Sequence, residues 1–184
     1  MKNLSVIEEE YGRCLRTYTG KKVDVFDPDP ESICIEDIAH ALSNLCRFAG
    51  HVKYFYSVAE HSLITAMLAP PELRKQALLH DATEAYMIDL PRPIKREIKQ
   101  YCDIEDNLAA VIAKKFGIEY PLHKQIDKID KAVCQSEFRH LLLGEKIWNI
   151  PAIRNWTPEI MEAIFLMAYR NNERGIELMH GFNA

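Results

Sequence analysis

Apolar residues recur at intervals of three and four positions along most of this chain, which is the spacing that gathers side chains on one face of an α-helix. Stripes of this kind run through residues 35–45, 104–116 and 124–143. Gly50 and Gly117 follow the first two stripes and are suitable positions for a helix to end. The pattern predicts an amphipathic helix over each of these ranges.

Capping residues and prolines define further helices between and after these stripes. Residues 57–60 have the Ser-x-x-Glu spacing of a capping box, and Pro70 ends the helix that follows. Pro71 can then serve as the first residue of the next helix. Residues 157–159 begin a last helix, which is apolar nearly all round from 160 to 168, so we expect it to be central in the fold.

Residues 18–35 depart from the helical pattern. Residues 19–26 alternate like a short strand, residues 27–30 (Asp-Pro-Asp-Pro) have turn composition, and residues 33–35 could return as a partner strand. The expected fold class is therefore all-α, with a possible short N-terminal β-hairpin. We expect a single domain over residues 1–184, with the motif-bearing core at about residues 35–145.

The composition favours a soluble cytoplasmic enzyme. The 184 residues are 48% hydrophobic, which is ordinary for one globular domain. No apolar run approaches the roughly 20 residues that cross a bilayer, and residues 1–10 become acidic too early for a signal peptide. The five cysteines form no Cys-x-x-Cys motif, which favours free thiols in a reducing compartment. The net charge of −4 argues against a nucleic-acid partner.

The adjacent pair His80 and Asp81 is the strongest chemical signal. It lies within an apolar segment expected to be helical, where burying both groups is costly without a partner. A divalent cation is the usual partner, because neutral imidazole supplies a nitrogen and a carboxylate supplies an oxygen and charge. Glu84 follows one turn later, and we expect it on the same helix face. A free carboxylate there is suited to accept a proton from a metal-activated water.

His61 and Asp130 are the other candidate ligands. His61 lies one turn inside the helix capped at Ser57, and Asp130 lies between Ile126 and Val133 on the apolar side of its helix. Taken alone, such a histidine is most often a hydrogen-bonded core residue, and such an aspartate is most often a solvated charge. Three helices that each present an inward-facing ligand favour a shared metal ion over these separate explanations.

The order of these residues resembles the H…HD…D signature of the HD-domain metal-dependent phosphohydrolases. Residues 59–63 (AEHSL), 79–91 (LHDATEAYMIDLP) and 129–132 (IDKA) are similar to the three motifs of the superfamily's 5'-deoxynucleotidase branch. Residues 37–51 also resemble small bacterial and phage HD family hydrolases. The resemblance implies an all-α HD-domain bundle.

The resemblance also implies roles for individual residues. The four ligands of one divalent metal match His61, His80, Asp81 and Asp130. Glu84 matches the catalytic carboxylate that acts on the attacking water or the leaving group, and Asp89 matches a second acidic residue near the sugar and phosphate. Two histidines and two aspartates suit Zn, Mn, Co, Fe or Ni, so the identity of the metal stays open.

The candidate substrate-binding residues are Arg47, Phe48 and His51. In the deoxynucleotidases an Arg-Trp pair contacts phosphate and deoxyribose, and its nearest match is Arg47 with Phe48, where phenyl replaces indole. The alternatives are a surface position for Arg47 and a core position for Phe48. His51 is a pocket residue, a substrate contact or an exposed loop residue. The basic run at residues 95–99 is a solvated face or a rim that attracts phosphate.

The expected function is hydrolysis of a small nucleotide, with deoxynucleoside 5'-monophosphate as the leading substrate. The first alternative is a deoxynucleoside triphosphate triphosphohydrolase, which needs additional cations for the β- and γ-phosphates. The second is a catalytically inactive nucleotide-binding module. The resemblance further implies a homo-oligomer, a dimer or higher, and neither the composition nor the motifs imply a membrane partner.

Overall fold

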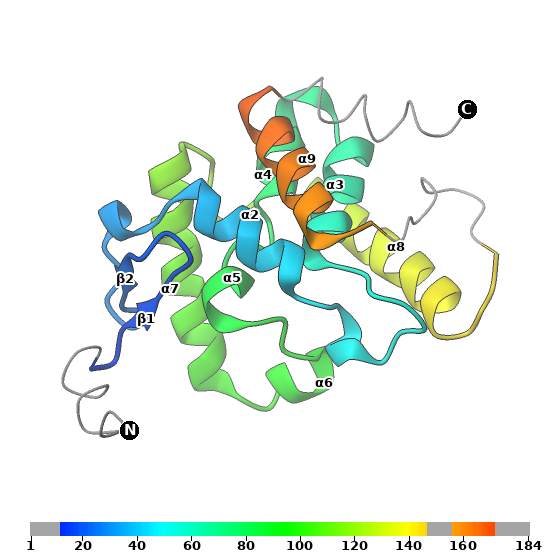
Figure 1. The fold of residues 1–184 in the computed structure, drawn as a ribbon, viewed down its shortest axis with the longest axis horizontal. Coiled ribbons are helices and arrows are strands. Elements are labelled where there is room, and N and C mark those ends of the chain that lie inside the picture. Colours follow the sequence, from blue (N-terminus) through cyan, green and yellow to red (C-terminus); the bar gives the residue numbers. More distant parts are fainter. Residues whose placement is uncertain (1–11, 147–155, 172–184) are drawn as a thin grey trace.

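The computed structural model describes residues 12–146 and 156–171, and the helices dominate it (Figure 1). The all-α expectation is confirmed, together with the short hairpin near the N-terminus. The elements are β1 (Leu15–Arg16), β2 (Lys22–Val23), η1 (Pro30–Ser32), α2 (Ile35–Asn44), η2 (Phe48–Gly50), α3 (Val58–Leu68), η3 (Pro71–Leu73), α4 (Arg74–Leu78), α5 (Glu84–Met87), α6 (Arg92–Lys95), α7 (Lys99–Phe116), α8 (Lys124–Leu141) and α9 (Pro158–Arg170).

Helix α3 is the centre of the fold. Every residue from 58 to 67 is buried, and the helix packs against α2, α4, α8 and α9. The Ser57 side chain accepts a hydrogen bond from the backbone N–H of Glu60, so the predicted cap is present. Figure 1 shows α9 passing in front of α3, with α2 on one side of α3 and α8 on the other.

The last helix, α9, does not have the central position expected of it. Met161 and Phe165 are buried on the face that packs against α2 and α3, but Ile160 is 46% exposed. The central position belongs to α3, which carries His61, Ser62 and Thr65 among its apolar residues. Because these polar residues interrupt the apolar sequence of α3, the hydrophobic pattern did not predict that the helix would be fully buried.

The hairpin forms from other residues than those expected. Leu15 pairs with Val23 and Arg16 with Lys22 in an antiparallel ladder. Asp29 caps η1 by accepting a hydrogen bond from the backbone N–H of Glu31, so the Asp-Pro-Asp-Pro segment does turn the chain. Residues 33–35 do not return as a strand, because they lead directly into α2.

The segment that carries His80 and Asp81 is also not the continuous helix that was predicted. Helix α4 ends at Leu78, residues 79–83 form turns, and α5 begins at Glu84. The His80 Nδ1 atom lies 2.7 Å from the Ala77 carbonyl oxygen. A side chain that hydrogen-bonds to a helix carbonyl oxygen competes with the backbone N–H groups for that oxygen. Beyond Leu79 the first backbone hydrogen bonds join residues three apart, as in a 3₁₀ turn, rather than four apart.

The helices that the structure describes include none with both the length and the apolar character needed to cross a membrane.

Candidate metal centre

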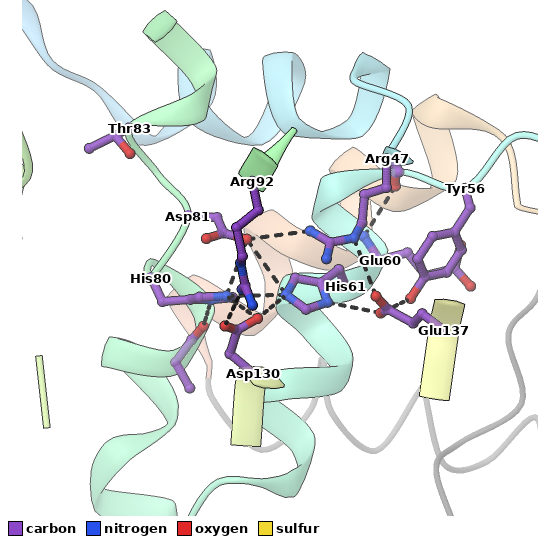
Figure 2. Close-up of polar contacts among 12 residues, drawn as sticks. Arg47, Tyr56, Glu60, His61, His80, Asp81, Thr83, Arg92, Asp130 and Glu137 are labelled. Carbon is purple, nitrogen blue, oxygen red and sulfur yellow. Dashed lines mark hydrogen bonds and ion pairs between the residues drawn. The ribbon is translucent and has the colours of Figure 1, made fainter. Parts of the chain in front are cut away.

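Four side chains from three parts of the chain converge beneath the turn at residues 79–83 (Figure 2). His61 Nε2 lies 3.2 Å from His80 Nε2 and 3.0 Å from Asp130 Oδ1. Asp81 Oδ2 lies 3.2 Å from His80 Nε2 and 3.6 Å from His61 Nε2. His61 comes from α3 and Asp130 from α8. The group His61, His80 and Asp130 can hold a metal ion.

The outer nitrogen of each imidazole is occupied, which determines what the inner nitrogen offers. His80 Nδ1 faces the Ala77 carbonyl oxygen at 2.7 Å, and His61 Nδ1 faces Glu137 Oε1 at 2.8 Å. Both partners are acceptors, so each Nδ1 carries a proton. In the neutral imidazoles, the two Nε2 lone pairs then point at one another and at two carboxylates. A cation between them removes this repulsion, and such outer hydrogen bonds are typical of metal-binding histidines.

The spacing of the donor atoms agrees with a shared ion. Ligands about 2.0–2.2 Å from a metal in tetrahedral geometry lie about 3.3–3.6 Å from one another. The donor separations here run from 3.0 Å, between His61 and Asp130, to 3.7 Å, between His80 Nε2 and Asp130 Oδ1. Asp81 Oδ2 lies within the same range of the two histidine nitrogens, while the group whose donor atoms all lie close to one another is His61, His80 and Asp130. The residues present therefore fit a metal ion without rearrangement of the backbone.

Without a metal, the same groups stabilise one another as charges. Burial opposes protonation of His80, but Asp81 and Asp130 outweigh it and raise its pKa well above the ordinary value. Burial and the Arg47 charge oppose protonation of His61, yet Glu137 and Asp130 raise its pKa. Burial would raise the pKa of both aspartates, but the histidines lower it. Protonated imidazoles thus supply the positive charge that the two aspartates face.

Glu137 is a functional residue that the sequence reasoning missed. Its side chain is fully buried on α8, and its Oε1 accepts a hydrogen bond from the Tyr56 hydroxyl at 2.5 Å as well as from His61. Its Oε2 lies 3.3 Å from Arg47 Nε. Glu137 follows Asp130 by seven residues, which is two helical turns, so both face α3. This seven-residue spacing is the sequence feature that could have identified Glu137.

Arg47 reaches the centre because the chain before α3 pairs with the chain after α2. Cys46 and Ser57 form an isolated antiparallel bridge, and the Arg47 N–H donates to the Tyr56 carbonyl oxygen at 2.9 Å. The Arg47 side chain is buried, with Nη1 3.6 Å from Asp81 Oδ2. Arg47 is therefore not the surface residue of the alternative interpretation.

Phe48 and Ala49 follow in a strained conformation. Their φ angles are 55° and 52°, a left-handed region that residues other than glycine seldom adopt. Such strain clusters at functional sites. The Phe48 ring lies 5.4 Å below the Arg47 guanidinium and 6.2 Å from the Phe138 ring.

A cavity of about 440 Å³ opens beside the four converging side chains. The structure brings Arg47, Phe48, Glu84 and Asp89 to its wall, together with Asp81 and Asp130. His51 is exposed and does not line the cavity. Further lining residues that were not among the candidates are Arg92, Lys95, Cys134 and Phe138.

The two basic residues contribute in different ways. Arg92 Nη2 is 3.9 Å from Asp130 Oδ2, and its side chain is 54% exposed. Lys95 Nζ is 2.5 Å from Glu105 Oε2. Lys95 is the member of the basic run at residues 95–99 that lines the cavity, whereas Arg96 and Lys99 do not. The cavity thus has two cationic side chains besides Arg47.

Two carboxyl groups at this wall have raised pKa values. Glu84 is buried, and its Oε2 has no hydrogen-bond partner within the described ranges. Burial, followed by the charges of Asp81 and Asp89, raises the pKa of Glu84 well above its ordinary value. Burial also raises the pKa of Asp89. Carboxyl groups with raised pKa values beside a cavity are typical of proton-transferring sites.

Replacing Glu137 tests how far the centre depends on it. We expect Glu137→Ala to lower the free energy of unfolding by about 3–5 kcal/mol, because it removes the nearer of the two carboxylates that pair with the buried Arg47 charge. Urea unfolding measures this change. Glu145→Ala is the matched control, since Glu145 pairs with Arg139 on the exposed end of the same region and should cost less than about 1 kcal/mol. Equal effects of the two variants would contradict the role assigned to Glu137.

Comparison with known proteins gives relatives without an assigned function. No protein-family model matches the chain. The chain is 40% identical over 127 residues to the uncharacterized protein RCAP_rcc00048 of Rhodobacter capsulatus, covering 64% of this chain and 65% of that protein. It is also 40% identical over 137 residues to the uncharacterized protein YfdR of Escherichia coli, covering 74% of this chain and 77% of YfdR. This extent of similarity shows that the chain belongs to the same protein family as YfdR.

Proposed function

We propose that the protein is an HD-type metal-dependent phosphohydrolase that hydrolyses a small nucleotide, with deoxynucleoside 5'-monophosphate as the leading substrate. The observation that carries the proposal is the convergence of His61, His80, Asp81 and Asp130 at donor separations that suit one ion. The centre adjoins a cavity whose wall also holds an arginine and two further carboxyl groups. Metal ligands, an anion-binding group and a proton acceptor are the parts that phosphate-ester hydrolysis needs.

His61, His80, Asp81 and Asp130 are the residues that would hold the metal in this proposal. A divalent ion there would supply Lewis-acid polarisation of a phosphoryl oxygen and would lower the pKa of a water molecule toward neutrality. Glu137 holds the His61 ring in the orientation that presents Nε2. The Ala77 carbonyl oxygen does the same for His80.

In this proposal, the other residues at the cavity bind the substrate or transfer a proton. Arg47 binds phosphate oxygens from a rigid position, because Glu137 and Asp81 already hold its guanidinium. Glu84 accepts or returns a proton through its carboxyl group, on the wall shared with Asp81. Asp89 contacts the sugar side of the substrate. Phe48 supplies an apolar wall against the deoxyribose ring.

A specific observation favours the triphosphohydrolase as the second candidate. Arg92 and Lys95 line the same cavity as Arg47, so cations are available for phosphates beyond the first. Both are paired with carboxylates in the structure, with Asp130 and Glu105 respectively. In both reactions the bond between the α-phosphorus and the 5'-oxygen of the nucleoside is broken, so the released product, phosphate or triphosphate, distinguishes the two substrates.

A screen of phosphate release tests the function. We expect inorganic phosphate from deoxynucleoside monophosphates, only with an added divalent metal, and no release by an Asp130→Asn variant prepared in the same way. Release of inorganic triphosphate from deoxynucleoside triphosphates would instead select the second candidate. If the metal-loaded protein binds nucleotides but releases neither product, the protein is an inactive nucleotide-binding module and the hydrolase proposal fails.

The pH dependence of stability tests the metal centre without any assay of activity. The raised pKa values of His61 and His80 mean that protonated imidazoles stabilise the metal-free fold fully below about pH 6.5, and that this contribution is lost as the pH rises through the folded-state values. Metal binding needs neutral imidazoles, so its stabilisation grows over the same range. We therefore expect the difference in melting temperature with Zn²⁺ or Mn²⁺ and with a chelator to widen from about pH 6 to about pH 8.

His51→Ala should behave as wild type in this measurement, because His51 is exposed and outside the cavity. His61→Ala should show no dependence on added metal. A difference in melting temperature that stays constant with pH would argue that these histidines are not the ligands.

Glu84→Gln separates proton transfer from binding. The amide has nearly the shape of the carboxyl group, and Glu84 Oε2 makes no hydrogen bond within the described chain, so the fold and metal content should be unchanged. Turnover should fall by about 10²–10⁴-fold while the nucleotide Kd stays within a few-fold of wild type. Glu72→Gln, at an exposed position before α4, is the control. Wild-type turnover in Glu84→Gln would exclude Glu84 as the proton acceptor.

A further inference from the structure

A second cavity, of about 380 Å³, lies where β1, α2 and α5 meet. Glu84 lines both this cavity and the one at the metal centre. The other residues on which the argument depends are Tyr18, His40, Asn44, Tyr86 and Ile88. The volume is within the range of small-molecule sites, roughly 300–1,000 Å³. None of the roles proposed for the metal centre uses these five residues.

An exposed aromatic ring stands at this cavity in a fixed orientation. The rings of Tyr18 and His40 are stacked, with centroids 3.7 Å apart and 7° between their planes. His40 Nδ1 lies 2.9 Å from Glu162 Oε2 of α9, which anchors the imidazole to the fold. Tyr18 is nevertheless 64% exposed. A large aromatic side chain that is held in place and still exposed offers a flat surface on which another planar ring can stack.

Tyr86 contributes its side chain to the wall of the cavity, but not its hydroxyl. The side chain is only 7% exposed, and the hydroxyl oxygen is shielded and lies beside the backbone N–H of Cys34. A bound molecule therefore contacts the apolar part of Tyr86.

Asn44 and Ile88 complete the chemistry of the wall. Asn44 Nδ2 donates to the His40 carbonyl oxygen at 2.9 Å, which orients the amide and leaves its oxygen as an acceptor. Ile88 has φ 63° and ψ 157°, a region that is normally restricted to glycine, and its side chain is 58% exposed. An apolar β-branched side chain in such a conformation, at the edge of a cavity, suggests a contact that the protein alone does not supply.

We propose that this second cavity binds the planar heteroaromatic ring of a nucleobase. The ring stacks on Tyr18, and an exocyclic amino group or ring N–H donates to the Asn44 oxygen. Ile88 packs against the edge of the ring. A nucleobase combines a flat face with donors and acceptors along one edge, which is what these residues recognise. The base belongs either to a free nucleoside or to a nucleotide whose phosphate lies at the metal centre.

Binding is measured by calorimetry on the full chain, with deoxynucleosides of all four bases and no phosphate. The titrations use chelator-treated wild-type protein, so the result does not depend on hydrolysis or on the metal. We expect at least one nucleoside to bind. Tyr18→Ala should weaken its affinity by about fivefold to a hundredfold. Tyr18→Phe should keep it within about twofold because the ring remains, and Tyr86→Phe should also keep it within about twofold because the Tyr86 hydroxyl is shielded from the cavity. Phe26→Ala, at another exposed aromatic of the N-terminal region, is the control and should bind as wild type.

Nucleotide kinetics then identify the source of the base. If Tyr18→Ala raises KM and leaves kcat unchanged, the base belongs to the substrate. If KM is unchanged while nucleoside binding is weakened, the ligand is a separate nucleoside. The proposal is overturned if no nucleoside binds at millimolar concentration, or if binding is the same in wild type and Tyr18→Ala. Neither of those results bears on metal-dependent phosphate release, so this inference can fail while the proposed function stands.

Discussion

The fully buried carboxylate of Glu137 is the constraint on which the metal centre depends. A charge in the interior is tolerated only when it is paired and hydrogen-bonded. Tyr56 and His61 donate to one of its oxygens, and Arg47 lies beside the other. These partners belong to the segment before α3, to α3 itself and to the segment after α2. One carboxylate thus joins three parts of the chain to α8, and it leaves His61 Nε2 as the nitrogen that faces Asp130 and His80.

The same arrangement lets the charges of the candidate metal centre balance with or without a cation. Asp81 and Asp130 stand opposite two imidazoles whose outer nitrogens are occupied by acceptors. When no metal is bound, the imidazoles take up protons and pair with the aspartates, which is the reason for their raised pKa values. When a metal is bound, it takes the place of those protons. The same backbone arrangement therefore suits both states. The packing of α3 against α8 holds the four polar groups together in either case.

Much of the fold could be predicted from the sequence, because helix periodicity and capping are local. The Ser57 cap, the ends of α3 and α7 and the presence of a hairpin are examples. The sequence also singled out His61, His80 and Asp130, which the structure brings together in a group that could hold a metal ion. The break between α4 and α5 could not, since it depends on a hydrogen bond from the His80 side chain to the Ala77 carbonyl oxygen. Glu137 was missed because an isolated glutamate on a charged helix resembles a solvated residue until Arg47 and Tyr56 are placed beside it. The second cavity is formed by residues from three separate elements, and no local pattern joins them.

The break after Leu78 also has a structural consequence for the chemistry. In a continuous helix, Glu84 would follow the direction of α4 and move with it. The turn at residues 79–83 instead makes α5 a separate element of four residues, with Glu84 at its start and Ile88 directly after its end. Glu84 lines both cavities, and Ile88 lines the second one immediately before Asp89 lines the first. A short element has few backbone hydrogen bonds of its own, so its position depends on what packs on each side. A molecule in the second cavity would press on the backbone that holds Glu84 and Asp89, and it would do so without touching a metal ligand.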